Sequence, residues 1–134
     1  NDVTKAIILS GIMWITIYFI PFLKYPANPP TVGENETVFL RTFLYLLLIA
    51  ISGISALGFY KLSTRLQNNK KYFALLGYII FIAVIFFVMP ENPDVITAPM
   101  NLVNEFRLVS VLGVSSFWGS VGIILGLFWK KFNY

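Results

Sequence analysis

One stretch decides the fold class of this chain. Residues 42–60 read TFLYLLLIAISGISALGFY and contain no Asp, Glu, Lys or Arg. At about 1.5 Å per residue, a helix of this length crosses a hydrocarbon layer of roughly 30 Å. Residues 6–23, 72–89 and 108–129 are equally free of charge. We therefore predict an all-α, polytopic membrane protein with four transmembrane helices in a bundle, which forms one domain over residues 1–134.

The composition supports this class and excludes others. Hydrophobic residues make up 57% and charged residues 12%, against about 45–50% and 25% in soluble domains. The net charge of +4 comes without an arginine-rich stripe or a base-stacking platform, so we predict no nucleic-acid partner. The first apolar run is too long and too aromatic for a typical signal peptide, and we count it as a membrane helix.

The charges are distributed unevenly between the segments that flank the four runs. Seven of the ten basic residues fall in the two termini and in the segment between the second and third runs. The other two connecting segments hold five of the six acidic residues. By the positive-inside rule, we predict a multi-pass protein of the cell membrane with both termini in the cytoplasm.

Two proline-rich segments, residues 24–41 and 90–107, should therefore form extracytoplasmic loops. Proline fixes φ and lacks a backbone donor, so we expect rigid, irregular caps there. Residues 34–37 are placed to cap the second helix, and Asn101 or Asn104 the fourth. Each half of the chain also reads helix, proline-rich loop, arginine and small-residue helix, which allows a parallel duplication.

Small residues mark two of the predicted helices. In a membrane, helices associate through close packing, which such residues permit. We expect the two small-residue faces to pack against each other, although either could instead accept a helix from another subunit. The candidate packing residues are Ser52, Gly53 and Ala56 in the second helix and Ser115, Gly119, Gly122 and Gly126 in the fourth.

Residues that could carry chemistry are scarce. The chain has no His and no Cys, and the four runs hold no ionisable acid or base. Met13, Met89 and Met100 are better suited to filling gaps than to binding Cu(I). Glu34 with Glu36, or Glu91 with Asp94, could hold a hard cation, but solvated carboxylates are the commoner case. We predict no catalytic residue, no metal site and no cofactor.

Two arginines stand on the side expected to be poor in positive charge. Arg41 and Arg107 each lie at the mouth of a predicted helix. We expect them to pair with loop carboxylates, with Glu36 and Glu105 as the nearest candidates, or with loop carbonyls, and so to fix the cap. A phosphate or lipid-headgroup contact is the functional alternative.

Several short motifs surround these arginines. Residues 21–30 read PFLKYPANPP, followed by Val32-Gly33, Thr37 and Arg41-Thr42, and residues 105–110 read EFRLVS. These motifs resemble the CbtA family of predicted cobalt transporter subunits. The motif residues are Pro21, Lys24, Tyr25, Pro26, Asn28, Pro29, Pro30, Gly33, Arg41, Phe106 and Arg107.

The resemblance implies an integral membrane fold and a part in cobalt uptake. Family members usually carry a further N-terminal membrane region with a His-containing stretch, whereas these 134 residues have neither that length nor any His. The chain thus resembles the family's scaffold without its most plausible metal-binding part.

Two functions remain open at this point. We first expect a non-catalytic accessory subunit of a larger membrane complex, since the small-residue faces suit other integral-membrane subunits. The Ile-, Asn- and Lys-rich usage suggests an archaeal membrane enzyme such as ammonia monooxygenase. The alternative is a subunit of a transporter for cobalt or another divalent metal.

Overall fold

The computed structural model describes residues 1–132, and in this range the chain is helical with no strand. The first span runs from Asp2 to Lys24 in three parts. These parts are α1 (Asp2–Met13), the π-helix η1 (Trp14–Phe19) and α2 (Ile20–Lys24). The remaining elements are α3 (Val38–Arg65), the short 3-10 helix η2 (Asn68–Lys70), α4 (Lys71–Val88) and α5 (Met100–Phe132). Together these elements form four segments that are long and apolar enough to cross a membrane, as the charge-free runs predict. The segments are Asp2–Lys24, Val38–Arg65, Asn68–Val88 and Met100–Phe132.

The helices extend beyond the predicted boundaries, most clearly in α3 and α5. α3 begins at Val38 rather than Thr42 and ends at Arg65, and α5 begins at Met100 rather than Leu108. A charge-free run marks only the part that fits a hydrocarbon layer. Lysine and arginine are good helix formers, so the same helices continue through residues such as Arg41 and Arg107.

The expected capping was wrong in its details. Asn101 and Asn104 lie within α5. Thr37 is the N-cap of α3, but its side chain makes no capping hydrogen bond. Its Oγ1 instead contacts the Glu34 carbonyl at 2.9 Å and the Asp94 carboxylate at 2.8 Å. Because Asp94 competes for this hydroxyl, Thr37 links two loops rather than closing one helix.

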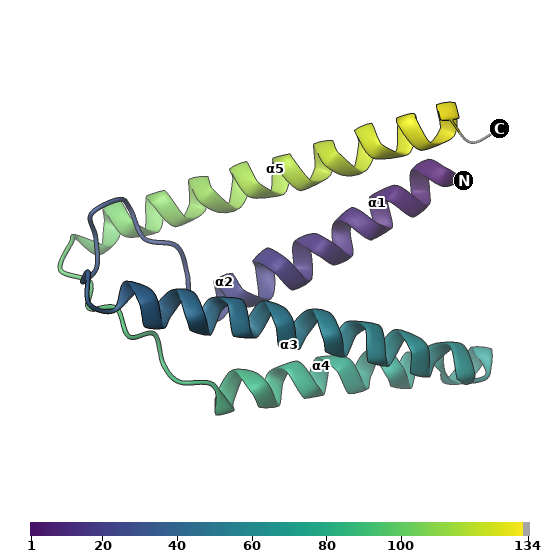
Figure 1. The fold of residues 1–134 in the computed structure, drawn as a ribbon, viewed down its shortest axis with the longest axis horizontal. Coiled ribbons are helices and arrows are strands. Elements are labelled where there is room, and N and C mark those ends of the chain that lie inside the picture. The colour runs from purple at the N-terminus through teal and green to yellow at the C-terminus, as the bar shows by residue number, and fades with distance from the viewer. Residues whose placement is uncertain (133–134) are drawn as a thin grey trace.

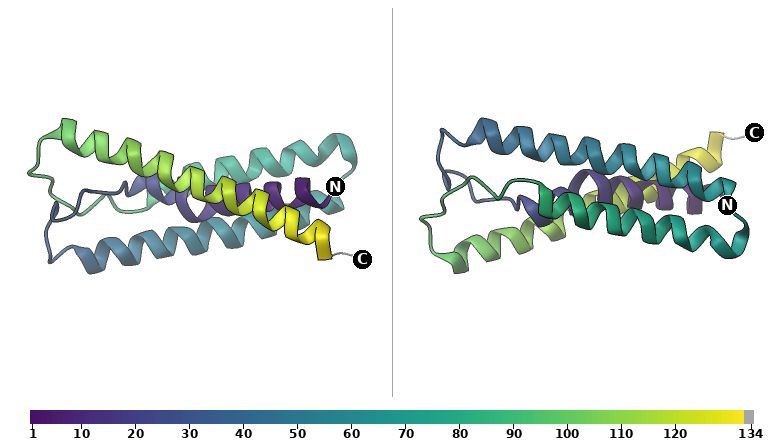
Figure 2. Two further views of the ribbon diagram at one scale, coloured as in Figure 1. Left: turned by 90° about the horizontal axis from the view of Figure 1, so that it is seen from above. Right: turned by 90° about the horizontal axis from the view of Figure 1, so that it is seen from below.

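The helices form two pairs, α1 with α5 and α3 with α4 (Figure 1). The pairs meet mainly through η1 and α2, which contact α3. Segments 25–37 and 89–99 lie together at one end of the molecule, which we call the loop end. The α3–α4 turn, residue 1 and the end of α5 lie at the opposite end, which we call the turn end, and all three views agree on this (Figures 1 and 2).

The small-residue face of α5 packs on α1, which corrects the expected pairing with α3. A Cβ atom on Gly126 would lie 2.8 Å from the Val3 Cα, and one on Gly122 would lie 3.3 Å from the Ile7 Cα. The Ser10 hydroxyl donates to the Trp118 carbonyl across the same contact. Val3, Ile7 and Ser10 are spaced by helical turns, so α1 also presents one continuous face. On α3, by contrast, Gly53 has open space at its Cβ position.

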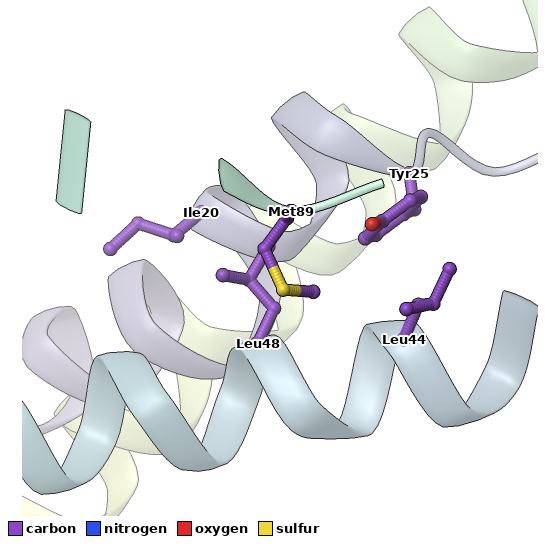
Figure 3. Packing of buried hydrophobic residues seen from close by; sticks show 5 residues of the cluster. All are labelled: Ile20, Tyr25, Leu44, Leu48 and Met89. Carbon is purple, nitrogen blue, oxygen red and sulfur yellow. The ribbon is translucent and has the colours of Figure 1, made fainter. Parts of the chain in front are cut away.

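A small apolar core joins the pairs near the loop end. Ile20 and Tyr25, at the end of the first span, pack with Leu44 and Leu48 of α3 and with Met89 (Figure 3). Tyr25 and Leu48 are fully buried. Met89 follows the last residue of α4, so three segments that are distant in sequence converge here. The core therefore holds segment 25–37 against the start of α3 and the end of α4.

Candidate functional site

The loop end is organised around one carboxylate, that of Asp94. Its side chain is only 2% exposed and lies 2.8 Å from the Arg41 guanidinium. Asn28 Nδ2 donates to Asp94 Oδ2 at 2.9 Å, and Thr37 Oγ1 donates to Oδ1 at 2.8 Å. A buried charge is stable only when it is paired and hydrogen-bonded. Asp94 meets both conditions, and it ties its own loop to segment 25–37 and to α3.

The two arginines bind the same loop from different helices. Arg41 of α3 donates to the Pro26 carbonyl at 2.7 Å in addition to pairing with Asp94. Arg107 of α5 donates to the Ala27 carbonyl at 3.1 Å and to Asn28 Oδ1 at 3.0 Å. Asn28 thus accepts from Arg107 and donates to Asp94. We call Asn28, Thr37, Arg41, Asp94 and Arg107 the cap network.

Two residues beside the cap network, Tyr25 and Gly33, also have restricted conformations. The Tyr25 hydroxyl donates to the Pro90 carbonyl at 2.7 Å, and burial raises the pKa of this hydroxyl. Gly33 has a φ of 105°, and a Cβ there would lie 3.4 Å from the Asp94 carboxylate. A side chain at residue 33 would therefore be strained, because this φ lies in the region that favours glycine.

The structure brings some of the motif residues together and leaves others apart. Asn28, Arg41 and Gly33 lie directly against Asp94. Pro26 and Arg107 join through Arg41 and Asn28, and Tyr25 binds the Pro90 carbonyl. Lys24 lies 5.0 Å above the Phe86 ring, and the Pro29 carbonyl accepts from Val32 within its own loop. Pro30 and Phe106 lie outside the network: Pro30 is in segment 25–37 and Phe106 is in α5.

The expected carboxylate partners of the arginines were wrong, although pairing of the arginines with loop groups was correct. Arg41 pairs with Asp94 rather than Glu36, and Arg107 binds a carbonyl and an amide rather than Glu105. Glu36 and Glu105 are exposed. Nearness in sequence was a poor guide, because the fold places the second loop beside the first. The available signal was that both proline-rich loops were predicted on the same side of the membrane.

A second polar site lies deep in the first span, where Pro21 interrupts the helix. Proline has no N–H, so the Ile17 carbonyl loses its α-helical donor and the Thr16 carbonyl loses its π-helical donor. Two hydroxyls from α3 contact these same carbonyls. Ser52 Oγ donates to the Thr16 carbonyl at 2.9 Å, and the Tyr45 hydroxyl donates to the Ile17 carbonyl at 3.5 Å. In membrane helices, hydroxyl side chains and neighbouring helices satisfy the backbone carbonyls that a proline leaves without a donor.

Two further hydroxyl contacts near η1 involve the helices α4 and α5. The Tyr78 hydroxyl of α4 donates to the Ser52 carbonyl at 3.2 Å, and the Tyr18 hydroxyl lies 3.4 Å from Ser110 Oγ of α5. This arrangement explains why Ser52, a predicted packing residue, is fully buried. These hydroxyls bond to partners within the protein, whereas the buried Trp14 Nε1 of η1 has no hydrogen-bond partner among the described residues.

Replacing Ser52 with alanine tests this second site. The Ser52→Ala variant should lose about 1 kcal/mol of stability, because the buried Thr16 carbonyl would lose its donor. Thermal melting in detergent measures the loss. Ser55→Ala is the matched control, because Ser55 Oγ donates only to carbonyls of its own helix, at 2.6 Å and 3.1 Å. Equal melting temperatures for the two variants would contradict the role of Ser52.

The remaining predicted packing residues line a groove or face open space. Ser115 and Gly119 line a groove of about 320 Å³ between α1 and α5, together with Trp14 and Trp118. A Cβ on Gly119 would meet nothing within 4 Å. Ala56 of α3 is half-buried. Of the stripe on α5, Gly122 and Gly126 make the close helix contact.

The acidic residues considered as cation ligands were two pairs in the proline-rich loops, and one of these pairs includes Asp94. No group of three or more His, Cys, Asp or Glu suited to a metal ion occurs among residues 1–132. Asp94 is engaged by Arg41, Asn28 and Thr37. The cap network can therefore rigidify the loops, but its one carboxylate is already occupied by protein partners.

These features define a multi-pass helical membrane protein whose long loops are held by a buried ion pair. A family model described as "Probable cobalt transporter subunit (CbtA)" matches residues 1–130, so the chain belongs to the CbtA family. The resemblance seen in the sequence motifs is thereby confirmed. A search of curated proteins and a search of solved structures find no match.

Proposed function

We propose that this chain is a non-catalytic integral-membrane subunit of an assembly that transports cobalt or a related divalent metal. The observation that carries the proposal is the family match over residues 1–130. It favours transport over the accessory role in an archaeal ammonia monooxygenase that we expected first. Residues 1–134 act as one transmembrane domain, with the loop end extracytoplasmic and both termini cytoplasmic, in keeping with the positive-inside rule.

In this proposal the chain supplies the scaffold and another subunit supplies the metal ligands. Two features support this division. The hydroxyl groups around η1 are neutral and are bonded within the protein. The Asp94 carboxylate is paired with Arg41, so its negative charge is already compensated. A divalent cation needs several free oxygen or nitrogen ligands, and a partner that shares the membrane can provide them.

The cap network gives this scaffold a mechanical role. Asp94 and Arg107 connect the second loop and α5 to segment 25–37, and Arg41 connects α3 to both loops. Movement of one helix pair at this end is therefore transmitted to the other. A partner subunit that binds the metal would meet a preformed, rigid surface rather than two mobile loops.

Deleting the chain from its cell tests the proposed function. Cells without it should accumulate much less cobalt at low external concentration, and a plasmid copy should restore accumulation. Complexes isolated in mild detergent should contain further transporter subunits. Unchanged cobalt accumulation, together with stable co-migration with the catalytic subunits of a membrane enzyme, would reject transport in favour of the accessory role.

A further inference from the structure

The α3–α4 turn concentrates positive charge without any compensating acid. Lys61, Arg65, Lys70 and Lys71 fall within eleven residues, and the chain has no Asp or Glu between residues 42 and 90. All four side chains are exposed. The two ion pairs found in residues 1–132 lie elsewhere and involve Lys5 and Arg41. The α3–α4 turn therefore carries a local excess of four positive charges.

A cleft opens beside two of these cations. Gly58, Lys61, Leu62 and Arg65 line a cleft of about 320 Å³. Their spacing of three and four residues places them on one face of α3. A Cβ on Gly58 would meet nothing within 4 Å, so the floor of the cleft is open. The cleft thus combines two cations with an apolar base, which suits a phosphate attached to a hydrocarbon chain.

The depth at which these cations lie relative to the membrane favours a lipid over a protein partner. Tyr60 and Tyr72 adjoin the cations and are 69% and 77% exposed. Tyrosine concentrates where headgroups meet hydrocarbon. The charge-free run of α3 stops at Tyr60, and the charge-free run of α4 starts at Tyr72. Lys61 and Arg65 lie one and five residues beyond Tyr60, so both fall within two helical turns of the membrane surface, near the depth of lipid phosphates.

We propose that the α3–α4 turn binds the headgroup of an anionic phospholipid, with Lys61 and Arg65 on its phosphate. Lys70 and Lys71 add to the positive charge, and Gly58, on the hydrocarbon side of Tyr60, leaves room for the start of an acyl chain. Juxtamembrane clusters of four or more Lys and Arg are known to attract anionic lipid. The lipid stabilises the turn end, whereas the cap network stabilises the loop end. This inference does not depend on cobalt transport.

Lipid titration in detergent tests the proposal. The purified chain in a neutral maltoside is titrated with palmitoyl-oleoyl phosphatidylglycerol or phosphatidylcholine, and native mass spectrometry counts the bound lipids. Phosphatidylglycerol should bind more tightly. A Lys61→Gln/Arg65→Gln variant should lose about fivefold in affinity per cation removed. Gly58→Leu should also weaken binding, because its side chain fills the cleft while the charge is unchanged.

The matched control removes two cations from the other helix pair. A Lys130→Gln/Lys131→Gln variant should keep the affinity of the wild-type chain. Equal binding of the two lipids would overturn the proposal, and so would equal losses in the two double variants, since that result shows only an effect of net charge. Displacement of phosphatidylglycerol by an equimolar glutamate-rich peptide would also overturn it and would identify an acidic protein segment as the occupant.

Discussion

Replacing Asp94 with alanine should destabilise the loop end strongly. The Asp94→Ala variant leaves Arg41 without its carboxylate and removes the acceptor of Asn28 and Thr37. Breaking a buried ion pair on one side costs about 3–5 kcal/mol. We expect the lower end of this range, because a quarter of the Arg41 side chain (23%) is exposed. Thermal melting in detergent measures the loss, and limited proteolysis should show faster cleavage within residues 25–37.

Glu36→Gln is the matched control for this prediction. It also removes one negative charge from the loop end, but Glu36 is exposed and forms no ion pair in the described chain. Its melting temperature should stay close to that of the wild-type chain. If Asp94→Ala melted like Glu36→Gln and resisted protease equally, the cap network would not be what holds the loops.

Leucine at residue 126 should force α1 away from α5. A Cβ there would already lie 2.8 Å from the Val3 Cα, and backbone cannot yield as a flexible side chain can. Such overpacking costs about 1–3 kcal/mol or more. Hydrogen exchange should rise along α1 in the Gly126→Leu variant, because its first turns would separate from α5. Mass spectrometry of peptides from residues 2–13 measures this change.

Gly113→Leu provides the comparison within the same helix. Gly113 has open space at its Cβ position, so the added side chain should point away from the protein. Exchange in α1 should then remain at the wild-type level. Protection of α1 that is unaffected by Gly126→Leu would contradict the close approach of α1 to α5.

The four spans could be predicted from the sequence, but their internal geometry could not. Absence of charge over about twenty residues is a local property, and it identifies a membrane-spanning length directly. The π-helix depends on where Pro21 removes a donor and on which neighbour replaces it. Pro21 itself was a visible signal inside the first run. That Ser52 and Tyr45 would supply the missing hydrogen bonds depends on tertiary packing.

The choice of helix partner was also beyond the sequence. α3 and α5 both carry small residues, and this composition alone suggested that they pack together. In the structure Gly122 and Gly126 face α1, whose Ser10 contributes to the same contact. A small-residue face shows that something approaches closely, but it does not identify what approaches.

The candidate site was predicted only in part, for a related reason. The two arginines were recognised because they opposed the distribution of positive charge. Asp94 was noted only as an acid in a proline-rich loop, and its partners come from residues more than fifty positions away. Loop residues have no periodicity from which burial can be inferred. Recognising Asp94 as the centre required the relative placement of both loops.

The proposed role in cobalt transport is tested most directly by the initial rate of radioactive cobalt uptake at low external cobalt. Cells whose only copy of this chain is wild type, Asp94→Ala or Glu36→Gln are compared with cells that lack it. We expect normal uptake with the wild-type chain and with Glu36→Gln, and strongly reduced uptake with Asp94→Ala and without the chain. Wild-type rates in cells that lack the chain would contradict the proposed role.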